Sequence, residues 1–218
     1  MGDAIGVSVG TAALGSGYAP VPAPLRPVLP AAGLSRGSAV AVEDRDLPLL
    51  LALAAGAAGD GLWAAVGLPQ LGALAAAEAG LSLESGLWVD TPGDQWAHAL
   101  SVVVESVPVV MLASPGSVPE RTGRRLAAVL RRSGAVLLVA GPWEGAQVRL
   151  RVARSAWAGV GAGHGLLTGR RAEVRAWGRG AAGAGAAAVV WLPGPSGQVA
   201  EVVEAPGRRA VVPLTGVG

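Results

Sequence analysis

The sequence predicts an α/β protein with a mostly parallel sheet flanked by helices and followed by an antiparallel β meander. Up to residue 140, short continuous apolar stretches alternate with helical segments of about ten residues, which is the order of βαβ units. Beyond that point the pattern changes, because residues 147–154 and 171–177 alternate apolar with polar side chains. A period of two is typical of half-solvated antiparallel strands.

The first core strand is expected at residues 39–43, which are apolar and bounded by turn residues. A buried helix follows at residues 47–59, where Asp46 suits the N-cap and Pro48 is tolerated in the first turn. The other elements are expected, in chain order, as strand 62–66, helix 71–79, strand 86–89, helix 93–104, strand 107–112, helix 120–133, strand 134–140, and strands 147–154, 171–177 and 187–192.

Composition also predicts the domain organisation. Residues 1–24 are rich in Ala, Pro, Gly and Val, and we expect a flexible leader there. Residues 25–193 are expected to form one domain. Residues 194–218 are interrupted by Gly and Pro and are expected to form a C-terminal tail with two short apolar pieces.

Several classes of site and location are excluded by composition. The chain has no Cys, hence no disulfide and no thiolate zinc site. His98 and His164 are too few for a metal cluster, so we expect no metal and no cofactor. No basic segment precedes the N-terminal apolar stretch, and the apolar run 47–59 is shorter than the roughly 20 residues of a membrane span. We therefore expect a soluble, cytoplasmic protein without membrane association.

The basic residues are all Arg, seventeen in number, and they are distributed unevenly. Residues 1–120 hold three Arg and eleven acids, whereas residues 121–218 hold fourteen Arg and four acids. Such an asymmetry is compatible with nucleic acid binding, with an acidic partner, or with head-to-tail self-association. The sequence leaves these three interpretations open.

Residues 33–58 have the layout of a nucleotide-binding α/β unit: a glycine-flanked strand, a sharp turn and a buried helix. A working phosphate loop needs a glycine-rich cradle, a Lys for the phosphates and a Ser or Thr for magnesium. The turn here is instead Glu43, Asp44, Arg45 and Asp46, and the chain has no Lys. The carboxylates would repel a triphosphate, and Asp46 would occupy the helix N-terminus that a phosphate would use.

Hydrolysis also requires an acid that supports magnesium and a Glu that activates water. The second and fourth strands end at residues 66–69 (VGLP) and 111–114 (MLAS), without a carboxylate. We therefore expect no ATP hydrolysis and no enzyme activity; the alternative is an unconventional nucleotide site that uses Arg45. The residue types of a hydrolase triad occur at Ser114, His164 and Asp90, but no Gly-x-Ser-x-Gly elbow accompanies them. We interpret the set as coincidence.

Three stretches of the sequence resemble the RecA family: GLSRGSAVAVE, AAAEAGLSLESGLWVDTPGDQWAHAL and RRLAAVLRRSGAVLLVAG. The chain is still more similar to ImuA-type proteins of actinobacteria, through RRLAAVLRRSGAVLLV, VRLRVARSAWAGVGAGHGLLTGRRAEVRAWGRG and the terminal VVWLP. The resemblance covers roughly residues 25–193 and depends on the whole pattern, since no single motif suffices. It implies a RecA-like core without a functional phosphate loop.

The resemblance also implies a function. ImuA-type proteins are RecA-like accessory factors of the damage-induced (SOS) mutagenesis machinery, which performs translesion DNA synthesis. It thus implies a non-catalytic adaptor that binds the inactive Y-family polymerase homologue ImuB and, indirectly, an error-prone C-family DNA polymerase and the sliding clamp. The alternatives are a SulA-like inhibitor of cell division, a RecA-like single-strand DNA binder and a residual ATPase.

The partner-binding residues are expected on two surfaces. Alternating positions of the antiparallel strands place four arginines on one sheet face, with only Glu173 among them, and unpaired like charges there favour an anionic partner. Apolar residues of the tail would supply a docking segment. The connection at residues 141–146 is too short for the DNA-binding loop that RecA proteins have there. The predicted residues are Arg149, Arg151, Arg171 and Arg175 on the strands, and Val202, Val203, Val211, Val212 and Leu214 in the tail.

Overall fold

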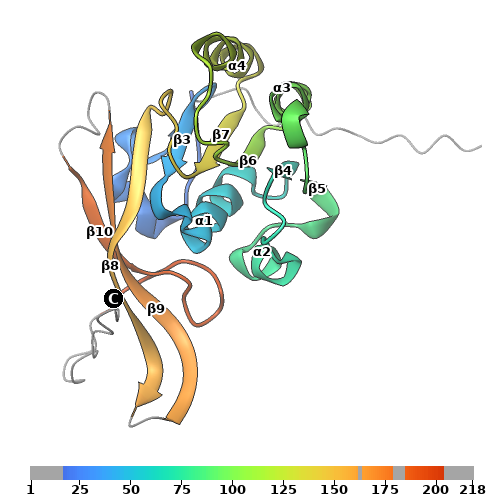
Figure 1. Cartoon of the computed structure of the whole chain (residues 1–218). Helices are drawn as coiled ribbons and strands as arrows, with labels where there is room; N and C mark the ends of the chain where they lie inside the picture. The colour runs from blue at the N-terminus through green and yellow to red at the C-terminus, as the bar shows by residue number, and fades with distance from the viewer. Residues whose placement is uncertain (1–16, 162–163, 179–184, 204–218) are drawn as a thin grey trace, which may run out of the picture.

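The structure, a computed structural model, describes residues 17–161, 164–178 and 185–203 (Figure 1). Its main feature is a nine-stranded sheet with the order β11-β10-β9-β8-β3-β7-β6-β4-β5, and a second, two-stranded sheet joins β1 to β2. The strands are β1 (Tyr18–Ala19), β2 (Leu34–Ser35), β3 (Ala39–Val42), β4 (Trp63–Val66), β5 (Gly86–Val89), β6 (Val109–Ala113), β7 (Val136–Ala140), β8 (Val148–Gly161), β9 (His164–Gly178), β10 (Ala187–Trp191) and β11 (Ala200–Glu201).

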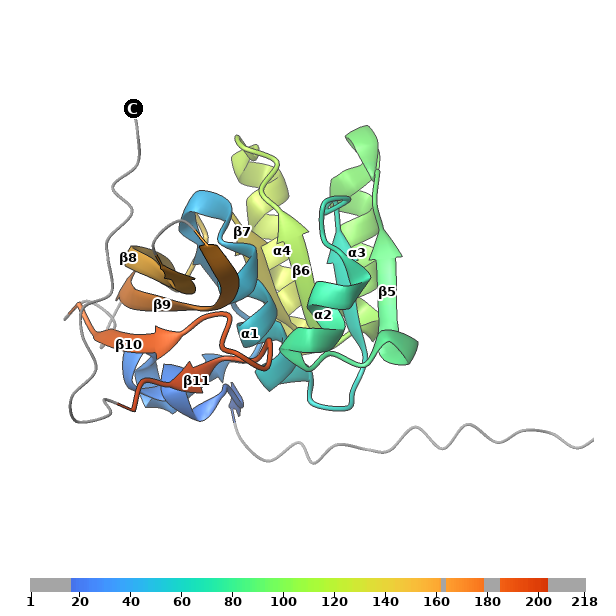
Figure 2. The same ribbon diagram turned by 90° about the horizontal axis from the view of Figure 1, so that it is seen from below.

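Helices lie on both faces of the parallel half of the main sheet (Figures 1 and 2). One core cluster joins α1 and α2 to one face of the sheet, and a second cluster joins α3 and α4 to the other. The α-helices are α1 (Leu47–Ala58), α2 (Ala73–Ala79), α3 (Trp96–Ser106) and α4 (Glu120–Ser133); the short 3-10 helices include η1 (Ala23–Val28), η3 (Glu43–Arg45) and η5 (Gly93–Gln95).

Strand β8 connects the two halves of the sheet. It pairs in parallel with β3 and antiparallel with β9, and β10 and β11 continue the antiparallel part. The predicted mixed α/β architecture, a mostly parallel sheet followed by an antiparallel meander, is therefore confirmed. The hairpin of β8 and β9 is longer than the predicted strands 147–154 and 171–177, and it projects beyond the helical layers (Figure 1). Two bulges, after Val152 and after Ala158, shift its register.

Helix α1 is apolar all round, and all of its residues from Leu49 to Ala54 are buried. Such a helix needs cover on both sides. The sheet covers one side. Helix η1, which packs against β9 and β10, contributes side chains to the same core cluster as α1 (Figure 2). A Cβ added at Gly56 would collide with the ring of Pro22, so the N-terminal segment runs directly over the helix.

The folded part of the chain is consequently longer than the predicted domain 25–193. Residues 17–24 were assigned to the leader, but Tyr18 and Ala19 form β1 and the side chains of Ala19 and Val21 are buried. Residues 194–201 were assigned to the tail, but β11 extends the main sheet. Local composition rich in Pro and Ala did not reveal this packing, because both contacts are made with distant parts of the chain.

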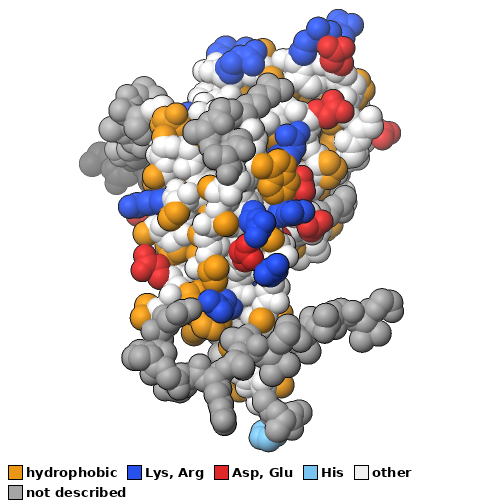
Figure 3. Space-filling view, turned by 90° about the vertical axis from the view of Figure 1, so that its left-hand side faces the viewer, with side chains coloured by type: hydrophobic (Ala, Val, Ile, Leu, Met, Phe, Trp, Pro, Cys, Tyr) orange, Lys and Arg blue, Asp and Glu red, His pale blue; other side chains and the backbone are white. Residues whose placement is uncertain are grey.

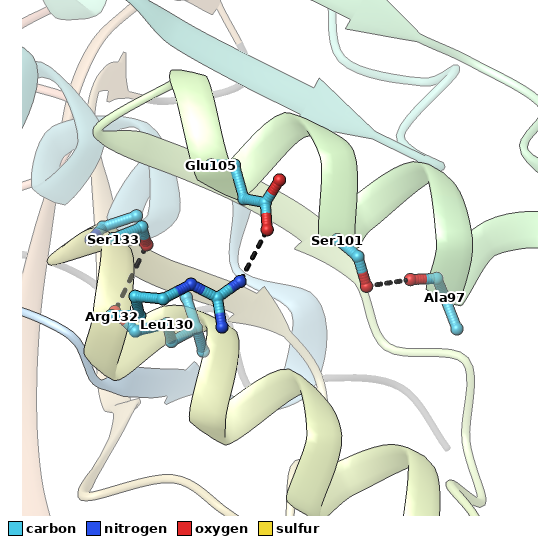
Figure 4. A network of polar contacts seen from close by, with 7 residues as sticks. Ala97, Ser101, Glu105, Leu130, Arg132 and Ser133 are labelled. Carbon is cyan, nitrogen blue, oxygen red and sulfur yellow. Dashed lines mark hydrogen bonds and ion pairs between the residues drawn. The ribbon is translucent and has the colours of Figure 1, made fainter.

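Helices α3 and α4 lie side by side on their face of the sheet (Figures 1 and 4). Near the end of α4, the Arg132 guanidinium donates to the Glu105 carboxylate of α3 at 2.6 Å (Figure 4). The prediction of α4 was exact, and Leu126, Val129 and Leu130 are buried as its amphipathic pattern indicates. Among the described residues, no helix is both long and apolar enough to cross a membrane.

Candidate functional site

The first candidate site is the carboxyl edge of the parallel strands, where α/β proteins usually bind ligands. After β3 the chain forms η3 instead of a glycine-rich loop, and Asp44 adopts a left-handed conformation with φ 55°. Asp46 then caps α1, because its carboxylate accepts a hydrogen bond from the Leu49 N–H at 3.0 Å. The predicted N-cap is thereby confirmed, and a side-chain carboxylate takes the place at the helix N-terminus that a phosphate would need.

Asp46 has a second partner that sequence reasoning missed. The Arg170 guanidinium, on β9, donates to the other carboxylate oxygen of Asp46. Both side chains are only 12% exposed, so the ion pair is almost fully buried. A buried carboxylate of this kind requires a cationic partner, and Arg170 supplies it from 124 positions along the chain.

Arg170 faces inward because of strand periodicity. Successive side chains point to opposite faces, so Arg170 shares its face with Ala172 and Val174, which belong to the core cluster beside α1. The adjacent Arg171 then lies on the opposite face. When two consecutive residues of a strand are both arginine, one of them must point toward the core side of the sheet. The consecutive arginines 170 and 171 are therefore a signal that could have identified Arg170 from the sequence.

At the neighbouring strand ends, polar groups stabilise the loops. The Ser114 hydroxyl donates to the Pro142 carbonyl at 2.7 Å and accepts from the Gly116 N–H at 3.2 Å, so it stabilises the loop after β6. After β4, the Gly67 N–H bonds the Val89 carbonyl across to β5. Within the described part of the chain, no group of three or more His, Cys, Asp or Glu residues is placed to hold a metal ion.

The three residues of the nominal hydrolase triad lie on separate elements. Ser114 follows β6, Asp90 follows the edge strand β5, and His164 begins β9 at the tip of the hairpin. Five strands separate β5 from β9 in the sheet. Residues 161 and 164 pair across the hairpin.

The second candidate site is the arginine face, defined as the outer face of β8, β9 and β10. Register places Arg149 opposite Trp177 and Arg151 opposite Arg175, and beyond the bulge it places Arg154 opposite Glu173. The four arginines predicted for this face therefore share it. The set is Arg149, Arg151, Arg154 and Ala156 on β8, Arg171, Glu173, Arg175 and Trp177 on β9, and Ala187, Val189 and Trp191 on β10.

Arginines of this face have partners, although Arg151 lies directly opposite Arg175. Glu173 accepts from the Arg175 guanidinium at 2.6 Å, and its other carboxylate oxygen lies 3.9 Å from Arg154. The Arg151 guanidinium stacks 5.3 Å above the centre of the Trp177 ring. Arg149 donates to the Trp143 carbonyl at 3.1 Å. The face is thus not the set of unpaired cations that the alternating pattern indicated; Arg154 and Trp177 are members that the prediction missed.

Exposed apolar side chains continue from this face into the hairpin. Between Arg154 and Arg170 the chain has no charged residue, and Leu166 and Leu167 are 82% and 58% exposed. In the predicted tail surface, Val203 is 82% exposed and Val202 is half-buried beside β11. The other tail residues, Val211, Val212 and Leu214, lie outside the described residues.

Comparison with known proteins identifies a family but no function. No curated protein matches the chain. Residues 27–145 match the family described as the MT3502 N-terminal domain. The match begins in η1 and ends before β8, so it spans the parallel half of the sheet with its helices. Since it covers 119 of the 218 residues, the chain belongs to the MT3502 N-terminal domain family.

Proposed function

We propose that this protein is a non-catalytic adaptor with a RecA-like core, which acts in damage-induced mutagenesis by binding an inactive Y-family polymerase homologue of the ImuB type. The observation that supports it most directly is the buried Asp46–Arg170 ion pair at the N-terminus of α1. It stands where a nucleotide-binding protein of this layout would hold its phosphates. A RecA-like protein that does not bind or hydrolyse a nucleotide would act by binding other macromolecules rather than by catalysis.

Energetics support this interpretation. A triphosphate at α1 would have to displace the Asp46 carboxylate from the helix N-terminus and leave one buried charge without its partner. Breaking a buried ion pair in this way costs about 3–5 kcal/mol. The order of the strands, parallel βα units followed by an antiparallel meander, is also the order that the RecA resemblance implies.

Isothermal titration calorimetry with ATP and magnesium tests the first half of the proposal. We expect no binding heat, for wild-type protein and for Asp46→Asn alike, because the turn offers no phosphate cradle. Micromolar binding to the wild type would contradict the non-catalytic assignment.

Titration of the ImuB-like partner tests the second half. The double variant Arg151→Glu/Arg175→Glu reverses two exposed charges of the arginine face, and we expect it to weaken binding at least about tenfold. Arg125→Glu, an exposed position on α4, is the matched control. A tail deletion should begin at residue 204, since a deletion from residue 199 would remove β11. No binding by the wild-type chain would refute the adaptor role.

A single-strand DNA binder is the second candidate, favoured by the stacking of Arg151 on Trp177. Glu173, in the middle of the face, counts against it because a carboxylate repels phosphate. Affinity for oligothymidylate that falls steeply between low and moderate salt would support this candidate. Undetectable binding at low salt would remove it.

A further inference from the structure

A groove of about 670 Å³ lies beside α4 on the side away from α3. Its walls are α4, the turn that leads into β3, and the connection between β7 and β8. The deepest side chains are apolar, since Ala39, Leu130 and Trp143 are buried. The lining of α4 extends from Glu120 to Arg131, which corresponds to a length of about 16 Å along the helix axis. That length accommodates about three helical turns of another chain.

The groove exists because the helical layer ends at α4. On this face of the sheet α3 and α4 cover the parallel strands, whereas the outer side chains of β8 to β10 are exposed or only partly buried. The Arg149–Trp143 hydrogen bond joins the wall of the groove to the arginine face. The groove and the arginine face therefore adjoin one another. Basic, acidic and hydrophobic side chains are interleaved on the side of the molecule shown in Figure 3.

The charges on this surface are predominantly positive. Three arginines and two glutamates line the groove, and five arginines and one glutamate lie on the arginine face, which leaves five net positive charges. In the groove, the charged side chains are exposed at the rim around the buried apolar base. An apolar base with a charged rim of three arginines and two glutamates, beside a strongly positive strand face, matches a helix that has one apolar and one acidic face.

The terminal segments of this chain outside the described residues carry too little negative charge to pair with the arginines, since residues 1–16 contain Asp3 as their single acid. Residues 204–218 contain Arg208 and Arg209 but only Glu204, so they share the sign of the rim. A nucleic acid fits less well, because its phosphates recur along the whole backbone and some would face Glu120, Glu144 and Glu173, whereas a peptide can place its acids opposite the arginines alone. A protein segment with acidic side chains can pair with the arginines and place its apolar side chains over Leu130 and Trp143.

We propose that the groove beside α4, together with the adjoining arginine face, binds an acidic amphipathic helical segment of a partner protein. This inference deepens the adaptor function proposed above and rests on it. It assigns the contact to α4 and β8, and it specifies the chemistry of the partner segment.

The test uses a fluorescein-labelled peptide of about five helical turns, with Leu on one face and Glu on the other, and the full-length chain. Fluorescence anisotropy should detect binding that weakens with salt. A peptide with every Glu replaced by Lys, a scrambled peptide of the same composition, and an oligothymidylate should each bind at least about tenfold more weakly. Equal binding of the Glu and Lys peptides, or tighter binding of the oligothymidylate, overturns the proposal.

Matched variants on α4 locate the contact. Ala127 lines the groove and Ala128 is exposed outside it, so Ala127→Trp should reduce peptide affinity about tenfold while Ala128→Trp leaves it unchanged. Arg131→Glu in the rim, compared with Arg125→Glu outside it, gives an independent test that adds no bulk. Circular dichroism confirms that each variant is folded. Unchanged affinity for both Ala127→Trp and Arg131→Glu would overturn the assignment.

The same variants, titrated with the ImuB-like partner, separate this inference from the adaptor proposal. If the partner binds wild type and groove variants equally, the groove assignment fails and the adaptor function stands. If the acidic peptide binds in the groove but the polymerase homologue does not bind the chain, the choice of partner fails and the groove remains a site for acidic helices.

Discussion

The carboxyl edge of β3 and the arginine face of β8 to β10 both concentrate charge, but they do so in opposite environments. At the edge, Asp46 and Arg170 are each 12% exposed and pair with one another. On the face, Arg154 is 84% exposed and Arg175 48% exposed, with Glu173 between them. The difference shows that charge alone does not mark a binding surface. Charges that are buried and paired stabilise the fold, whereas exposed ones remain available to a partner.

The largest effect is expected at the buried pair. Arg170→Met leaves the Asp46 carboxylate buried without a cation, and the free energy of unfolding should fall by about 3–5 kcal/mol. The double variant Asp46→Asn/Arg170→Met should recover most of this loss, because Asn also caps helices and is uncharged. Urea denaturation followed by Trp fluorescence measures both. A loss below about 1 kcal/mol for Arg170→Met would mean that the pair is not an important structural contact.

An intermediate effect is expected where the N-terminal segment crosses α1. Gly56→Ala should reduce the free energy of unfolding by about 1–3 kcal/mol, because the new methyl group collides with Pro22. Gly123→Ala is the matched control on the open side of α4. Its Cβ would lie 3.9 Å from the nearest Val118 atom, and the higher helix propensity of Ala should stabilise the protein by up to about 1 kcal/mol. Thermal denaturation distinguishes the two; a stabilising Gly56→Ala would contradict the packing of residues 17–24.

The smallest effect on stability is expected on the arginine face. Arg175→Ala removes a half-exposed partner of Glu173, and the free energy of unfolding should change by less than about 1 kcal/mol. The contrast with Arg170→Met, five positions earlier on the same strand, tests the comparison directly. A loss for Arg175→Ala as large as that for Arg170→Met would show that the face is structural rather than available for binding.

Local pattern was sufficient for most of the secondary structure. Helix α4 and strand β5 were predicted to the residue, and β3, α1 and β4 to within one residue at either end. The Asp46 cap followed from its position before an apolar run. The extension of the hairpin to residues 161 and 164 was not predicted, because the Gly-rich segment between Ser155 and Thr168 lacks a period-two pattern.

The sequence by itself determined the alternation of strands and helices, the acidic turn at residues 43–46 in place of the Gly, Lys and Ser or Thr of a phosphate loop, and the concentration of arginine after residue 120. Only the tertiary structure decided that Arg170 pairs with Asp46, that residues 17–24 cover α1, and that a groove opens beside α4. The physical reason is the separation along the chain between the residues that interact. Periodicity and capping depend on neighbours within one or two turns, whereas ion pairs and grooves between distant segments depend on the order of strands in the sheet.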